Sequence, residues 1–177
     1  HRVPFIVRWP GKVAPGSTCD TTICTTDFYA TFADILGKKD GIPDNAAEDS
    51  FSFYPCLQGE ADQTRPFTIH HSIAGKFAIR KGDWKLVMTD GPGGGWALSW
   101  EKTETSSKIV QLYNLRDDPA ETKNLEDVRP EIVGELVDDL AKALHDGRTT
   151  PGEKQTNEGW PYLDEKTKAV FSQLQEK

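Results

Sequence analysis

The chain has 177 residues, of which 36% are hydrophobic and 10% aromatic, and this fits one globular domain, or one domain with part of another. The composition excludes a collagen, a coiled coil and a membrane-spanning chain. The net charge of -7, with no segment in which Lys and Arg alternate with aromatic residues, argues against nucleic acid as a partner.

Cys19, Cys24 and Cys56 are too few cysteines for a disulfide scaffold in a chain of this length, although one Cys19–Cys24 pair stays open. These two lack the two-residue spacing of redox and zinc pairs, and no histidine lies near enough in the sequence to complete a ligand set. We therefore expect no metal site. His1 is followed by no charged and apolar leader, so we expect the chain to begin partway through a longer product.

Two elements are expected in the first forty residues. Residues 3–9 form a nearly continuous apolar run before a Pro-Gly pair, which predicts a strand buried on both faces, although its neighbours are not obvious in this sequence. A helix is expected after residues 25–27, any of which can cap it, and Gly37 is placed to end it. Its apolar face is expected to join the core through Phe28, Phe32, Ile35 and Leu36.

From Phe67 the hydrophobic period changes to two, which indicates strands. These strands are expected at residues 68–73, 77–80, 84–88 and 109–115. The second and third form a hairpin that turns at Lys81-Gly82-Asp83. Residues 90–95 are rich in glycine but lack the Lys and Ser/Thr of a phosphate-binding loop, so we expect a flexible loop.

An amphipathic helix is expected from Pro130, and Gly147 is placed to end it. Its apolar stripe consists of Ile132, Val133, Leu136, Val137, Leu140 and Leu144. Several antiparallel strands packed by one helix predict an α+β fold. The tail from Thr149 is polar, with residues 160–162 as an anchor and a short helix expected after Asp164.

Five segments, in the same order over residues 1 to about 150, resemble the sulfatase family of the alkaline phosphatase superfamily. They are His1-Arg2-Val3-Pro4 with the following FIVRWPGKV, Thr26-Asp27 with Asp34-Ile35-Leu36-Gly37, Glu48-Asp49-Ser50 with Leu57-x-Gly59, the run from Phe77 to Leu86, and Leu112-Tyr113-Asn114-Leu115 with Asp118-Pro119, Glu121 and Asn124-Leu125.

The resemblance implies that the chain consists of three parts. Residues 1–64 would be the C-terminal end of the large α/β sulfatase domain, containing its last strand and helix. Residues 65–150 would be the small C-terminal α+β subdomain, an antiparallel sheet packed by a C-terminal amphipathic helix, and residues 151–177 a polar tail.

The resemblance also implies that the catalytic groups lie upstream. Such sulfatases use a formylglycine made from a Cys or Ser in a Cys/Ser-x-Pro-x-Arg stretch, together with a Ca²⁺ ion. No cysteine here is followed by x-Pro-x-Arg. The pair Asp44-Asn45 has the same residue types as a pair of metal ligands in the family. It lies in a Pro- and Gly-rich loop, so we interpret it as a turn. We interpret Asp117-Asp118 as a turn and Asp138-Asp139 as a solvated helix face.

Substrate contacts are expected at His70 or His71, because the resemblance places the end of this strand beside the active-site mouth. Adjacent strand residues point to opposite faces, so only one of the two can face a cleft, and a structural role for both is equally open. Lys76, in the following turn, is a candidate for attracting an anionic sulfate ester, with a solvated turn lysine as the alternative.

The resemblance therefore implies that the chain is the C-terminal part of an arylsulfatase-like sulfuric ester hydrolase, inactive alone, with a sulfate ester as the parent's substrate. Two alternatives are a phosphonate or phosphodiester hydrolase of the same superfamily and a non-catalytic binding or assembly module. The resemblance implies a periplasmic or secreted protein, and charge and composition lead us to expect neither nucleic acid nor a membrane as a partner. If residues 3–9 are a strand of a larger sheet, their exposed edge would also favour self-association.

Overall fold

The computed structural model describes residues 3–60, 64–72, 75–89, 110–156, 168, 169 and 172. Several sequence-based predictions lie outside these residues: the His1-Arg2 start of the first matching segment, Ile73 and Ile109 at the ends of two expected strands, the glycine-rich loop 90–95 and the anchor 160–162. Of the helix expected after Asp164, the described residues Lys168, Ala169 and Ser172 are helical.

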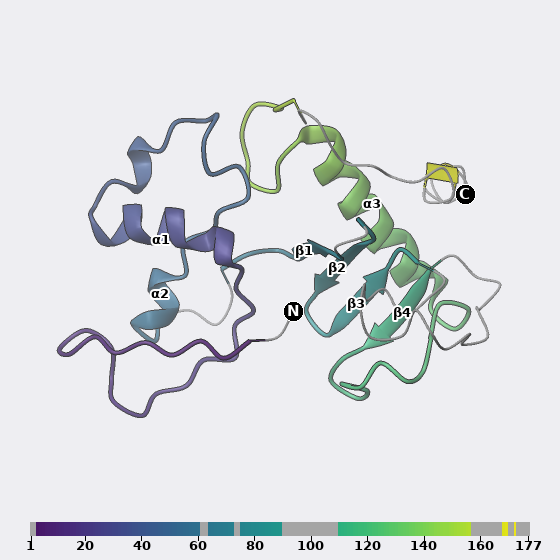
Figure 1. Cartoon of the computed structure of the whole chain (residues 1–177), viewed down its shortest axis with the longest axis horizontal. Coiled ribbons are helices and arrows are strands. Elements are labelled where there is room, and N and C mark those ends of the chain that lie inside the picture. Colours follow the sequence, from purple (N-terminus) through teal and green to yellow (C-terminus); the bar gives the residue numbers. More distant parts are fainter. Residues whose placement is uncertain are drawn as a thin grey trace. The chain divides into compact units, whose positions relative to one another are not determined.

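The chain folds into two compact units (Figure 1). The first comprises His1–Pro66 and Thr149–Glu153, and the second comprises Phe67–Arg148 and Lys154–Lys177. Within the described parts of both units, no helix has the length and apolar character needed to cross a membrane.

A four-stranded antiparallel sheet forms the centre of the second unit. Its strands are β1 (Thr68–His71), β2 (Phe77–Lys81), β3 (Trp84–Val87) and β4 (Gln111–Asn114), in the spatial order β1-β2-β3-β4. The hairpin between β2 and β3 turns at Gly82, whose φ of 56° lies in the left-handed region that glycine tolerates. The register aligns Ile79 with Leu86 and Leu86 with Leu112, which places three fully buried side chains in one row.

Helix α3 (Pro130–Asp146) packs on this row and completes the core of the second unit (Figure 1). It buries Val133, Leu136, Val137, Leu140 and Ala143. Proline stands in its first turn, where a missing N–H costs nothing, and Gly147 ends it with a φ of 63°. The α+β class, the expected helix and the positions of the four strands are thereby confirmed.

The first unit contains short helices joined by side-chain hydrogen bonds. Its helices are the 3-10 turn η1 (Thr25–Asp27), α1 (Phe28–Ile35), the 3-10 turn η2 (Lys39–Gly41) and α2 (Tyr54–Leu57). The Ala30 N–H of α1 donates to Ser50 Oγ at 2.8 Å, and the Phe53 N–H donates to Thr31 Oγ1 at 3.0 Å. These bonds attach the segment before α2 to the buried side of α1.

The strand expected at residues 3–9 is a wrong prediction for this chain. Within the described residues the segment forms no strand, and the side chains of Val3 and Ile6 are 73% and 89% exposed. A strand requires backbone partners on a neighbouring strand, and the four described strands pair only with one another. Phe5 instead packs edge-on against the rings of Phe28 and Phe53, with centroids 5.6 Å apart in both pairs.

The expectation that the apolar residues of α1 face the core is also wrong in part. The helix spans the predicted region and Gly37 follows it with a φ of 65°, but Phe32 and Leu36 are 57% and 72% exposed. The buried residues of α1 are Ala30 and Thr31, because the segment packed on that side approaches through backbone hydrogen bonds, which small and hydroxyl side chains permit.

Candidate functional site

The three residues expected to contact substrate lie at one end of the β1–β2 hairpin. His70 and His71 are the last residues of β1, which lies at one edge of the sheet, beside β2, among the described strands. The Ser72 N–H donates to the Lys76 carbonyl oxygen at 2.9 Å, and the Lys76 N–H donates to Ser72 Oγ at 3.3 Å. The closing turn of the hairpin therefore holds the backbone of Lys76 near the two histidines.

The two histidine rings lie on opposite faces of the sheet, as alternation along a strand requires. His71 shares the face of the core residue Phe77, its cross-strand partner, and the two ring centroids are 5.9 Å apart. Its side chain is exposed, and Nδ1 lies 2.9 Å from the Ser72 carbonyl oxygen. His70 lies on the face opposite α3 and is half-buried.

The surroundings of His70 keep its ring neutral. Burial lowers the pKa of His70 from 6.5 to about 4, and the positive charge of Lys85 acts in the same direction, as do His71 and Arg80. At neutral pH the imidazole therefore carries one hydrogen-bond donor and one acceptor, without a positive charge.

Arg80 and Lys85 share the sheet face of His70. They are cross-strand partners in β2 and β3, and the Arg80 Nε–H donates to the Gly82 carbonyl oxygen at 3.1 Å. Lys85 Nζ donates to both carboxylate oxygens of Glu121, at 2.6 and 2.8 Å. The sequence pattern does not single out either cation, because alternation places residues of different strands on one face only when the register is known.

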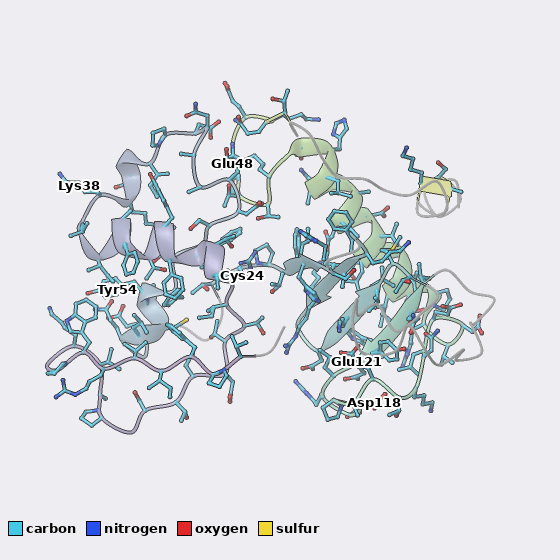
Figure 2. The ribbon with its side chains drawn as sticks, in the orientation of Figure 1. Cys24, Lys38, Glu48, Tyr54, Asp118 and Glu121 are labelled. Atoms are coloured by element: carbon cyan, nitrogen blue, oxygen red, sulfur yellow. The ribbon has the colours of Figure 1, made fainter. Side chains whose placement is uncertain are left out.

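The matching segment that follows β4 folds back along that strand. Figure 2 shows Asp118 and Glu121 in this loop. The Asp118 carboxylate accepts hydrogen bonds from the backbone N–H groups four and five residues later, both at 2.8 Å. Asn124 Oδ1 accepts a bond from the Leu112 N–H at 3.0 Å. This part of the family-like pattern holds Glu121 against Lys85, which is a structural role.

A buried ion pair in the first unit was not foreseen. Asp27 is fully buried and accepts bonds from Arg65 Nη1 at 2.8 and 2.9 Å and from the N–H groups of Cys24 and Phe51. Asp27 stands at the N-cap position of α1, as expected, but its side chain binds these three partners in place of the helix N–H groups. The sequence offered no signal for Arg65, because this contact depends on the tertiary fold.

The described residues contain no group of three or more His, Cys, Asp or Glu side chains that could hold a metal ion. Asp44-Asn45 lies in a turn, as predicted, and the Asp44 carboxylate accepts a bond from the Glu153 N–H at 2.9 Å. Of the other acidic pairs, Asp117 lies in a turn and Asp138 is exposed on α3.

Comparison with known proteins gives a family match over most of the chain. A family model described as "N-sulphoglucosamine sulphohydrolase, C-terminal" matches residues 1–150. An N-acetylgalactosamine-6-O-sulfatase of Bacteroides thetaiotaomicron is 35% identical over 137 residues, which cover 76% of this chain and 26% of the relative. Arylsulfatase A of Bos taurus is 28% identical over 174 residues, which cover 89% of this chain and 34% of the relative.

A solved structure has the same fold. A Bacteroides thetaiotaomicron protein of glycosaminoglycan metabolism superposes with a TM-score of 0.66 at 33% identity, covering 79% of this chain and 28% of that chain. The chain thus spans between about a quarter and a third of the length of the proteins that it matches.

Proposed function

The chain belongs to the sulfatase family, and from this premise we propose that it is the C-terminal part of an arylsulfatase-like sulfuric ester hydrolase. The match of the family model to residues 1–150 carries this proposal. The α+β unit of β1–β4 and α3 supports it, because a 33% identical protein of glycosaminoglycan metabolism has the same arrangement.

The family's cofactors, Ca²⁺ and formylglycine, belong in this proposal to residues outside the chain. Two observations support that placement. None of the three cysteines begins a Cys-x-Pro-x-Arg stretch, and the described residues do not fit a metal site. A Ca²⁺ ion needs about six to eight converging oxygen ligands. The role left to this chain is substrate binding, without a part in bond breaking.

His71 and Lys76 are the proposed substrate contacts, whereas His70 lies on the opposite face of the sheet. The exposed ring of His71 can reach a ligand beyond the sheet edge, and the Lys76 ammonium attracts a sulfate ester through its charge. Arg80 and Lys85 lie on the face of His70, opposite to His71, and the charge of Lys85 is paired with Glu121. His70 is neutral and can donate or accept a hydrogen bond.

The test is hydrolysis by the protein that carries this sequence together with its upstream part. We expect sulfate release from a chromogenic aryl sulfate or from N-acetylgalactosamine 6-sulfate, the second suggested by the name of the relative. The 177-residue chain alone should release none. Turnover of a phosphodiester or phosphonate without sulfate release would favour the alternative hydrolase.

A binding or assembly module remains the second candidate, favoured by the absence of a metal cluster among the described residues and of a Cys-x-Pro-x-Arg stretch in the sequence. Unchanged sulfate release after deletion of residues 65–150 would support it and contradict substrate contacts at the β1–β2 hairpin. We further propose a periplasmic or secreted location, which rests on the family resemblance, and self-association through the exposed N-terminal segment.

A further inference from the structure

Cys19 and Cys56 meet at one hydroxyl group in the first unit. Cys19 precedes η1, whereas Cys56 lies on α2, the short helix that carries Tyr54 in Figure 2. The Cys19 thiol donates to Thr21 Oγ1 at 3.2 Å, and the Cys56 thiol lies 3.5 Å from the same oxygen. Because both sulfur atoms contact one atom, they are at most about 7 Å apart, and a disulfide of about 2 Å then requires side-chain rotation together with a backbone shift that brings the two residues together.

The two thiols differ in solvent exposure, and stepwise oxidation requires only that one of them be reached by the oxidant. Cys19 is exposed, so a soluble oxidant can reach it, and Cys56 is buried beside it. Cys24 is half-buried in the neighbourhood of the Asp27–Arg65 pair. Burial is the largest influence and raises the pKa of the Cys24 thiol, as do the charges of Asp27 and Asp49, while the positive charge of Arg65 and a hydrogen bond with Thr26 act in the opposite direction. Cys24 is therefore a poorer nucleophile than an exposed thiol at neutral pH.

We propose that Cys19 and Cys56 are a disulfide-forming pair, and that Cys24 remains a thiol. This assigns the partner of Cys19 to α2, in place of the sequence neighbour at position 24. All three cysteines are thiols in the structure described above, so the bond forms on oxidation.

The reaction balances with a small-molecule disulfide such as oxidised glutathione as the oxidant. The Cys19 thiolate attacks one glutathione sulfur, which forms a mixed disulfide and releases one glutathione thiolate. The Cys56 thiolate then attacks Cys19 Sγ and displaces the second glutathione thiolate. The two cysteine protons pass through solvent to the two leaving thiolates, so the protein loses two electrons and glutathione disulfide gains them.

Such a bond would stabilise the first unit, which has a small apolar core, against unfolding. Among its described residues, the buried hydrophobic side chains are Ala30, Phe53 and Cys56. A Cys19–Cys56 bond closes a loop that contains η1, α1 and η2, and it restricts the unfolded chain over that whole length. The first unit should therefore resist unfolding better after oxidation.

The test is peptide mapping of the protein that carries this sequence, after incubation with reduced or oxidised glutathione and blocking of thiols with N-ethylmaleimide. Trypsin cuts after Lys12, and the protease Asp-N cuts before Asp20, Asp27 and Asp49. Cys19, Cys24 and Cys56 then fall in separate peptides, residues 13–19, 20–26 and 49–61. We expect a linked pair of the first and third peptides, with the second peptide blocked as a free thiol.

Cys24→Ser is the matched control and should keep the linkage, whereas Cys19→Ser should abolish it. The same samples should show a higher Tm after oxidation for the wild type and Cys24→Ser, and no rise for Cys19→Ser. Because Cys19 is exposed, its replacement leaves the buried packing intact. A bond from Cys24 to either other cysteine, or three blocked thiols under oxidising conditions, would overturn the proposal.

Discussion

At the scale of single residues, neighbouring side chains in this chain have different environments and therefore different chemistry. His71 is exposed at the edge of the sheet, whereas His70 is half-buried beside two cations. Asp27 is fully buried in an ion pair, whereas Asp118 is bound in an exposed turn. Burial and hydrogen-bond partners, more than residue type, determine which of these groups can meet a ligand.

We expect His71→Ala to raise KM for a sulfate ester in the full-length protein roughly tenfold, equivalent to about 1.4 kcal/mol, with kcat less affected. The reason is that a side chain that touches substrate without breaking bonds contributes to affinity. His70→Ala should instead lower Tm with little change in kinetics. Unchanged KM in both variants would make the pair purely structural, and loss of kcat would place one of them in the catalytic set.

The pH dependence of stability should reveal His70. Its pKa is 6.5 in the unfolded chain and about 4 in the folded chain, so between these values the unfolded state binds more protons. The contribution of His70 is therefore fully present above pH 6.5 and is lost as the pH falls towards 4. Thermal unfolding of His70→Gln should show a flatter decline of Tm over this interval than His71→Gln. Parallel curves for the two variants would contradict the assignment.

Breaking the buried Asp27–Arg65 pair should destabilise the first unit strongly. Arg65→Ala leaves a buried carboxylate without its cation, which costs about 3–5 kcal/mol of unfolding free energy in urea titrations. The control is Arg116→Ala, because the Arg116–Asp83 pair is 75% and 38% exposed and should contribute less than about 1 kcal/mol. Equal losses in the two variants would show that burial does not govern this pair.

At the scale of elements, local signals determined where helices and hairpins begin and end. Proline in the first turn and glycine after the last turn delimit α3, and Gly82 makes the β2–β3 turn. The same kind of signal placed the end of α1 correctly but did not reveal which of its faces is buried. Helix ends depend on backbone conformation nearby, whereas burial depends on what packs there.

Three glycine substitutions separate backbone strain from crowding. Gly147→Ala should cost about 1–3 kcal/mol, because φ is 63° and the new Cβ would collide with the Gln155 carbonyl group. Gly37→Ala has a similar φ of 65° with nothing within 4 Å, so it should cost less. Gly134→Ala, in the interior of α3, should stabilise by roughly 0.5–1 kcal/mol. Chemical denaturation of the three variants tests this order, which a destabilising Gly134→Ala would contradict.

At the scale of the whole molecule, the two units are stabilised by different interactions. The core cluster of the second unit joins β2, β3 and β4 to α3. The first unit relies on the Asp27–Arg65 pair and on hydrogen bonds from α1, and it exposes large apolar side chains: Val3, Ile6, Tyr29, Phe32 and Leu36. Of the large apolar side chains that are exposed among the described residues, all but Val128 lie in the first unit.

We expect the 177-residue chain to dimerise or aggregate through its N-terminal segment. Removing residues 1–10 eliminates Val3, Phe5 and Ile6 and should reduce association, which analytical ultracentrifugation over a range of concentrations would measure. Lys12→Ala, just beyond the deleted segment, serves as a control that keeps the apolar residues. A strictly monomeric chain at high concentration, unchanged by the deletion, would refute this expectation.

The sequence by itself determined the α+β class, the helix from Pro130 to Asp146, the β2–β3 hairpin and the membership of the sulfatase family. These features depend on periodicity, turn residues and motif order, all of which are local along the chain. Only the tertiary structure decided that residues 3–9 form no strand, that α1 exposes Phe32, that Asp27 meets Arg65 and that Cys19 lies near Cys56. Each of these outcomes depends on which distant segments come into contact, and a one-dimensional pattern does not contain that information.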